Sequence, residues 1–375
     1  MEETKDMCAM AHPENDPQFA GLNVNAGVSK PPIVNPYLKP RKRQALPNAA
    51  DLVEGILKGD VTRLAKAVTL VESVAPAHQA IAHEVIEKCL PHSGNSRRIG
   101  ITGVPGAGKS TSIDVFGLHV LKNGGKLAVL AIDPSSERSK GSILGDKTRM
   151  EKLSLHPSAF IRPSPSAGSL GGVARKTRET IILCEAAGYD NIFVETVGVG
   201  QSETAVHSMV DFFLLIQLAG TGDELQGIKR GIMEMADGIV INKCDGDNVE
   251  RAKLAAAQFR NALHLFPPTP SKWVPEVLTY SGYFELDIDK VWDMIDRYFD
   301  YVKKTGYFDL KRQQQAKYWM VETIDEQLRS NFYHLPEVRA LLEQKEMRVL
   351  NNEQSSFTAA KDVLDFYFER LRNRD

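Results

Sequence analysis

The apolar positions of the chain change their spacing along its length, and each change marks a boundary between predicted regions. From Ala50 to Leu90 they recur every three or four residues, which predicts three short amphipathic helices. Asp60 stands where the second helix would take its N-cap. We expect residues 48–96 to form a small helical bundle that packs against the domain that follows. The predicted apolar faces comprise Leu52, Ile56, Leu57, Leu64, Ala67, Val68, Leu70, Ile81, Val85 and Leu90.

From Arg97 onward, short uninterrupted apolar runs alternate with helix-patterned segments. Such runs are typical of parallel strands that are buried on both faces. The pattern therefore predicts an α/β domain over residues 97–305 with a mostly parallel, doubly wound sheet. Ligands of such sheets bind at the carboxyl ends of the strands. Strands are predicted at residues 99–101, 127–132, 192–197, 212–218, 238–241 and 274–278.

Helical spacing returns near the end of the chain. A helix is predicted from Ile288 to about Lys304 with a break at Gly306, and residues 306–375 then form a helical arm. Two separated apolar faces exceed what one small domain face needs, so we expect the arm to join two copies into a homodimer; packing within one copy is the alternative. The faces consist of Trp319, Ile324, Leu328 and Phe332, and of Val363, Phe366, Tyr367 and Leu371.

In residues 1–47 the apolar positions show neither helical spacing nor the short runs that are typical of buried strands. These residues mix Asn, Pro, Gly and charged residues, which predicts a mobile N-terminal arm. We interpret the basic run Lys39–Arg43 as a solvated charge cluster in preference to a docking site.

Composition narrows the choice of partners and location. A net charge of −2 gives no general attraction to nucleic acid or to an anionic membrane, and no apolar run approaches the length of a transmembrane helix. The acidic first residues do not resemble a secretory or organelle leader. The four cysteines are too far apart for a C-x-x-C motif or a disulfide framework. We therefore expect a reducing, cytoplasmic location.

A phosphate-binding motif lies between the first predicted strand and the next helix. Residues 103–110 read G-V-P-G-A-G-K-S and fit the P-loop pattern G-x-x-x-x-G-K-[ST]. The glycines allow backbone N–H groups to surround a phosphate chain at a helix N-terminus, so the domain is predicted to be a P-loop NTPase. Lys109 would bridge the terminal phosphates and Ser110 would offer its hydroxyl to Mg²⁺. The predicted nucleotide-binding residues here are Gly103, Val104, Pro105, Gly106, Ala107, Gly108, Lys109, Ser110 and Thr111.

A second motif selects the base. Asn242, Lys243 and Asp245 follow a predicted strand and match the N-K-x-D pattern of GTPases. An aspartate can accept hydrogen bonds from N1–H and N2–H₂ of guanine, which adenine lacks, so the predicted ligands are GTP and GDP. Ser281, Gly282 and Tyr283, beyond the last predicted strand, are expected to form the loop that contacts guanine O6.

Two acidic residues at strand ends are predicted to complete the site. Asp133 and Glu195 are candidate catalytic residues that would hold Mg²⁺ directly or through water, which we prefer for Asp133 over the alternative of a helix N-cap. A Ras-like enzyme has Gln directly after the glycine of the second acidic motif, where this chain has Val199, and Gln201 follows two residues later. We therefore expect slow intrinsic hydrolysis that a partner stimulates.

Several longer strings resemble one known family. The chain is similar to the G3E GTPases of the MeaB/MMAA (ArgK) branch over about residues 50–375. The strings that carry the resemblance are residues 103–111, 133–136, 145–150, 162–165, 195–203, 222–235 and 242–245.

The resemblance implies a GTP-hydrolysing chaperone of adenosylcobalamin-dependent methylmalonyl-CoA mutase, or of a related acyl-CoA mutase, that gates cofactor loading and protects the mutase from inactivation. It also implies that Asp146 joins Asp133 and Glu195 in the Mg²⁺ and switch positions. Asp223 and Lys229 match a third switch that touches the mutase, and Gln201 and Glu203 are the next candidates for a relay to that partner. Residues 218–221 depart from the usual composition of this switch.

Two alternatives remain open. A metallochaperone GTPase that delivers nickel or zinc would want a cluster of Cys and His, and the scattered Cys8, His12, His78 and His83 do not supply one. A protein kinase linked to arginine and ornithine transport, an older label within this branch, would need ATP, against which the N-K-x-D motif argues.

Overall fold

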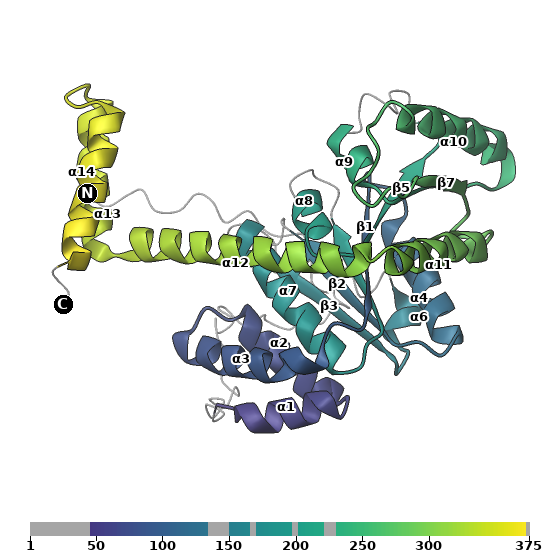
Figure 1. The fold of residues 1–375 in the computed structure, drawn as a ribbon, viewed down its shortest axis with the longest axis horizontal. Helices are drawn as coiled ribbons and strands as arrows, with labels where there is room; N and C mark the ends of the chain where they lie inside the picture. The colour runs from purple at the N-terminus through teal and green to yellow at the C-terminus, as the bar shows by residue number, and fades with distance from the viewer. Residues whose placement is uncertain (1–45, 134–149, 166–169, 197–201, 221–229, 373–375) are drawn as a thin grey trace, which may run out of the picture. The chain divides into compact units, whose positions relative to one another are not determined.

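The computed structural model describes residues 46–133, 150–165, 170–196, 202–220 and 230–372 (Figure 1). The predicted N-terminal arm lies almost wholly outside these residues, as do Asp146, Gln201, Asp223 and Lys229. The side chain of Asp133 is likewise not described. None of the described helices combines the length and hydrophobicity needed to cross a lipid bilayer.

A seven-stranded sheet forms the centre of the fold, in the order β3-β2-β4-β1-β5-β6-β7 (Figure 1). Every pairing between these strands is parallel, which confirms the predicted α/β class. The strands are β1 Arg97–Gly103, β2 Leu127–Asp133, β3 Ala159–Pro165, β4 Asn191–Thr196, β5 Phe212–Leu218, β6 Gly238–Asn242 and β7 Glu276–Thr279.

The strand β3 was not predicted from the sequence. Its residues, A-F-I-R-P-S-P, include Pro163 and Pro165, which cannot donate to a ladder of hydrogen bonds. The strand lies at the edge of the sheet and pairs with β2 on one side, so prolines are tolerated there. The other predicted strands differ from the observed ones mainly at their ends, as is usual for strand and helix boundaries.

Helices cover both faces of the sheet, as the uninterrupted apolar strands require. On β5, Phe212 and Leu214 face one layer while Phe213 and Leu215 face the other, and all four are buried. One layer consists of α4 Lys109–Lys122, α6 Glu151–Ser154 and α11 Ile288–Lys304. The other includes α7 Leu170–Ala186, α8 Ser202–His207, α9 Arg230–Met235 and α10 Val249–Leu263.

The expected N-terminal helices are present and pack on α7. They are α1 Ala49–Leu57, α2 Val61–Glu72 and α3 Pro76–Cys89, followed by the short 3₁₀ helix η3 Leu90–His92. Asp60 caps α2 as predicted, accepting hydrogen bonds from the backbone N–H of Thr62 at 2.7 Å and of Arg63 at 3.2 Å. Leu57 and Leu90 were expected in the core, but each lies at a helix end and is more than two-fifths exposed.

Three helices end the described chain: α12 Tyr307–His334, α13 Pro336–Leu350 and α14 Ser356–Arg372. The predicted apolar face of α12 is divided between two cores. Trp319 is buried in the core beneath the sheet, whereas Phe332 packs with Val363 and Tyr367 in a separate cluster of α12, α13 and α14. Between them, Ile324 and Leu328 are about half exposed. The two ends of α12 therefore serve different packing units.

The first half of α12 holds the segment Ser208–Asp211, which joins α8 to β5. Trp319 Nε1 donates to the carbonyl oxygen of Ser208 at 3.1 Å, and Gln315 Nε2 donates to that of Val210 at 2.8 Å. Lys311 Nζ donates to the carbonyl oxygen of Asp211 at 2.7 Å. These side chains pair backbone acceptors that burial would otherwise leave unsatisfied.

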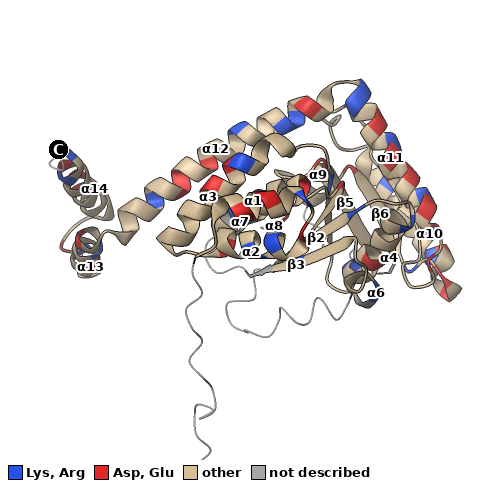
Figure 2. Cartoon of the chain, turned by 90° about the horizontal axis from the view of Figure 1, so that it is seen from below, with Lys and Arg blue, Asp and Glu red and all other residues tan. Residues whose placement is uncertain are grey.

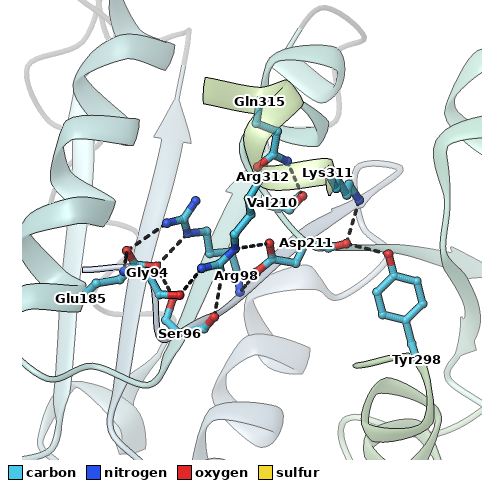
Figure 3. Close-up of polar contacts among 10 residues, drawn as sticks. All are labelled: Gly94, Ser96, Arg98, Glu185, Val210, Asp211, Tyr298, Lys311, Arg312 and Gln315. Carbon is cyan, nitrogen blue, oxygen red and sulfur yellow. Dashed lines mark hydrogen bonds and ion pairs between the residues drawn. The ribbon is translucent and has the colours of Figure 1, made fainter. Parts of the chain in front are cut away.

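A buried ionic cluster fastens the same helix to β1 and α7 (Figure 3). Arg312 donates from Nε and Nη2 to the two carboxylate oxygens of Asp211, at 2.9 and 2.7 Å. Arg98 on β1 donates to both oxygens of Glu185 on α7, at 2.8 and 2.9 Å, and its backbone N–H donates to Asp211. Burial alone would raise the pKa of Glu185, but the hydrogen bonds and charge of Arg98 outweigh it and hold that pKa below its usual range.

Candidate nucleotide site

The P-loop connects β1 to α4 and depends on its glycines. Gly108 is the N-cap of α4 with φ 87°, and Gly106 has φ 81°, a region that L side chains rarely adopt. A Cβ atom on Gly103 would lie 2.2 Å from the carbonyl oxygen of Ile216 on β5, and one on Gly108 would lie 2.5 Å from Asn242 Nδ2. The loop is thus packed closely against both β5 and the N-K-x-D segment.

Lys109 begins α4 and folds back over the loop. Its Nζ donates to the carbonyl oxygens of Gly103 at 2.9 Å and Val104 at 3.4 Å. Burial lowers the pKa of the Lys109 amine, and the charges of Glu195 and Glu203 counter part of that effect. A cation within the loop, together with the N-terminus of a 14-residue helix, favours a bound anion such as a phosphate chain.

A hydroxyl and a carboxylate meet beside Lys109. β1 and β4 are neighbours with Ile101 in register with Glu195, and Ser110 Oγ donates to Glu195 Oε1 at 3.4 Å. Oxygen donors of these two kinds suit Mg²⁺, which takes carboxylates, hydroxyls, water and phosphate as ligands. The backbone of Asp133 ends β2, the other neighbour of β4, at the same edge. The structure therefore brings Ser110 and Glu195 together and leaves Asp146 outside the described residues.

Asn242 links the phosphate and base segments. Its Nδ2 donates to the carbonyl oxygen of Ala107 at 2.7 Å. Its Oδ1 accepts from the backbone N–H of Lys243 at 2.7 Å and of Gly282 at 3.0 Å. Because the side chain is buried and all of these partners belong to predicted binding loops, Asn242 fixes the loops relative to each other.

Asp245 is held in place by the loop after β7. Ser281 Oγ donates to Asp245 Oδ2 at 2.6 Å and accepts from the backbone N–H of Phe284 at 3.2 Å. Lys243 has φ 60°, a left-handed conformation that is uncommon outside glycine. Tyr283 is 80% exposed and packs its ring against Phe284, with centroids 5.0 Å apart. The predicted base-reading residues are thus adjacent, with Tyr283 at the outer rim.

Two contributors were missed by sequence reasoning, and a third was given a different role. Ser112 Oγ donates to the carbonyl oxygen of Gly108 at 2.8 Å and is hydrogen-bonded to the hydroxyl of Tyr280, which ties the first turn of α4 to the base loop. Burial raises the pKa of Tyr280 far above its usual range, so its hydroxyl stays protonated. Glu203, on the first turn of α8, is fully buried and acts electrostatically on Lys109. Ser112 and Tyr280 lie outside the motifs, whereas Glu203 ends the string 195–203 and was suggested only as a relay.

Comparison with known proteins shows the family of the chain. The family model described as methylmalonyl-CoA mutase-associated GTPase MeaB matches residues 64–337. A putative GTPase of Caulobacter vibrioides is 49% identical over 309 residues, covering 82% of this chain and 94% of its own. The mouse mitochondrial methylmalonic aciduria type A homolog is 43% identical over 329 residues, covering 85% and 79%.

A solved structure extends the likeness to three dimensions. The crystal structure of a LAO/AO transport system kinase superposes with a TM-score of 0.69 at 38% identity, covering 86% of this chain and 99% of that one. Together with the P-loop, the paired Ser110 and Glu195, and the Asp245 site, these matches lead to one assignment. The chain belongs to the MeaB family of P-loop GTPases and hydrolyses GTP.

Proposed function

We propose that this GTPase is a chaperone of an adenosylcobalamin-dependent acyl-CoA mutase, methylmalonyl-CoA mutase above all, and that GTP hydrolysis gates the loading of the cofactor and protects the mutase from inactivation. The observation that carries the proposal is the match to a mutase-associated family over residues 64–337, which spans the whole nucleotide site. The partner stimulates a slow intrinsic rate, because the Gln that positions water in Ras-like enzymes is replaced by Val199.

The nucleotide is held by the loops described above, with Mg²⁺ as the cofactor. Ser110 and Glu195 are the described residues that would hold the ion, joined by Asp133 and Asp146 as the sequence suggests. When bound, Mg²⁺ neutralises charge that builds up on the β- and γ-phosphates. Lys109 contributes a second positive charge from the loop, and the buried Asn242 keeps the phosphate and base loops in register during turnover.

The relay to the mutase is assigned to Asp223 and Lys229, which lie outside the described residues. Lys229→Ala is expected to leave intrinsic hydrolysis within about threefold of wild type while most of the stimulation by the mutase is lost, since the missing contact exists only in the complex. The assay is GTP hydrolysis with and without the purified mutase and adenosylcobalamin. Failure of the mutase to change the wild-type rate or to bind the protein would contradict the chaperone proposal itself.

The transport-kinase alternative makes a different prediction about the nucleotide. A kinase that uses ATP would bind ATP at least as tightly as GTP, whereas in a GTPase the partly buried Asp245, left unpaired by adenine in the closed site, costs about 1–3 kcal/mol or more. We expect ATP to bind at least about a hundredfold more weakly than GTP by calorimetry. For the metallochaperone alternative, the described ranges contain no group of three His, Cys, Asp or Glu side chains placed to hold a metal ion.

The homodimer is proposed on the exposed apolar surface of the last three helices. Leu328 on α12, Leu350 on α13 and Phe357 on α14 are 57%, 75% and 87% exposed, and charges of both signs are interspersed along α12 (Figure 2). Ending the chain after Leu335 removes α13 and α14, and we expect light scattering to show half the mass with GDP binding kept. A full-length protein that is monomeric at tens of micromolar would refute the dimer.

A further inference from the structure

The buried carboxylate of Glu203 takes no part in the contacts of the nucleotide site described above. Glu203 lies on the first turn of α8, is 1% exposed, and its Oε1 meets no hydrogen-bond partner among the described residues. Its other oxygen, Oε2, accepts a long hydrogen bond of 3.4 Å from Ser202 Oγ. An unsatisfied buried acceptor costs about 1–3 kcal/mol and is retained where it binds water, an ion or a reacting group.

The helix α8 begins at Ser202, six residues after Thr196 ends β4, and the carboxyl end of β4 lies at the same edge of the sheet as the P-loop that follows β1. The charge of Glu203 acts on the amine of Lys109, together with that of Glu195. α8 itself is packed on β1, since a Cβ on Gly100 would lie 3.0 Å from Val206 Cγ1. Two carboxylates therefore act electrostatically on the lysine: Glu195 is paired with Ser110, whereas Glu203 keeps one oxygen without a partner among the described residues.

The hydrolysis reaction requires a group of this kind. In GTP hydrolysis the oxygen of a water forms a bond to the γ-phosphorus while the bond to the β–γ bridging oxygen breaks, and GDP leaves with that electron pair. An acceptor must hold the water in line, and the position that supplies Gln in Ras-like enzymes is Val199 here. A valine side chain cannot accept a hydrogen bond.

We propose that Glu203 positions the attacking water, its Oε1 accepting a hydrogen bond from that water. The proton of the water leaves with the inorganic phosphate, so the carboxylate ends each turnover unchanged. The proposal concerns the GTPase reaction itself and is independent of the mutase.

A purely structural role for Glu203 makes the opposite prediction for stability. An acid in the first turn of a helix can stabilise it, so its loss would lower the melting temperature. If Glu203 instead holds a water, Glu203→Gln removes a buried charge with an unpaired oxygen, and the melting temperature should stay the same or rise. The amide oxygen of glutamine is a weaker acceptor than a carboxylate, so hydrolysis should slow.

The experiment compares Glu203→Gln with Glu179→Gln, a matched change of a largely buried carboxylate on α7 that faces Arg175, remote from the P-loop contacts. We expect single-turnover hydrolysis of bound GTP to slow at least about tenfold in Glu203→Gln, with GDP affinity within about threefold of wild type. Glu203→Asp, which keeps the charge but shortens the side chain, should lose less. Glu179→Gln should hydrolyse at the wild-type rate.

Two results would overturn the proposal. One is a folded Glu203→Gln protein that hydrolyses GTP at the wild-type rate. The other is a loss of rate that is matched by weaker GDP binding and a lower melting temperature, which would assign Glu203 to the structure of α8.

Discussion

Replacing Arg312 by alanine tests how firmly α12 is built into the GTPase domain. The side chains of Arg312 and Asp211 are 14% and 2% exposed and make two hydrogen bonds to each other. Removing one partner of a buried ion pair leaves an uncompensated charge and costs about 3–5 kcal/mol. Asp211 would keep the hydrogen bond from the backbone of Arg98, but the carbonyl oxygens of Gly94 and Ser96 would lose the donors that Arg312 supplies, so we expect a loss of at least about 3 kcal/mol.

The matched control is Arg297→Ala. Arg297 pairs with Glu276 at 2.7 Å, but the two side chains are 53% and 34% exposed. Exposed pairs contribute about 0–1 kcal/mol. The assay is urea unfolding followed by circular dichroism, with a melting curve as the second readout, where 3 kcal/mol corresponds to about 5 °C in a domain of this size. Equal losses in Arg312→Ala and Arg297→Ala would refute the reasoning.

Three further predictions follow from the site and its surroundings. Burial, with the charge of Lys311, lowers the pKa of His207 from 6.5 to about 4, so the unfolded chain binds a proton more readily than the folded one and the free energy of unfolding falls as the pH drops from about 6.5 to about 4. At 1.36 kcal/mol per pKa unit this loss of stability is about 3 kcal/mol at most. His207→Phe should abolish this pH dependence in urea titrations across that range. Asp245→Asn should weaken GTP binding by about 1–3 kcal/mol and shift preference toward xanthine nucleotides, and calorimetry showing unchanged GTP affinity would contradict the base-reading role. Lys109→Ala should slow hydrolysis by about a hundredfold or more with little change in the melting temperature of the nucleotide-free protein, and a variant that retains activity would remove Lys109 from the phosphate site.

The parts of the fold that the sequence predicted correctly are those in which one physical requirement dominates. Strands buried on both faces need apolar side chains at nearly every interior position, so β2, β4, β5 and β6 could be predicted. Asp60 was identifiable because few side chains can satisfy the free N–H groups at a helix start. The edge strand β3 was not predicted, because a strand with one neighbour tolerates Arg, Ser and two prolines and so lacks an uninterrupted apolar run.

In the candidate site, too, some residues could be predicted from the sequence and others could not. Glycines and charges that contact phosphate and guanine form motifs in sequence, so the P-loop and Asp245 could be named in advance. Tyr280 and Ser112 could not, because their hydrogen bond joins residues 168 positions apart and either residue alone reads as an ordinary core or helix position. The role of Asn242 was also hidden, since a motif letter does not tell whether the side chain contacts the base or braces two loops.

The attachment of α12 has a consequence for the order in which the protein takes shape during synthesis. β5 lies near the middle of the chain, yet the backbone oxygens of Ser208, Val210 and Asp211 at its entrance are paired by side chains made about a hundred residues later. The sheet can therefore assemble as the ribosome proceeds, but its core is not closed until Trp319 has emerged. A chain that stops at Gly306 would leave these backbone oxygens without their side-chain partners, whereas one that stops at Leu335 would not. Nonsense mutations on either side of Trp319 should thus differ in whether they yield a stable protein.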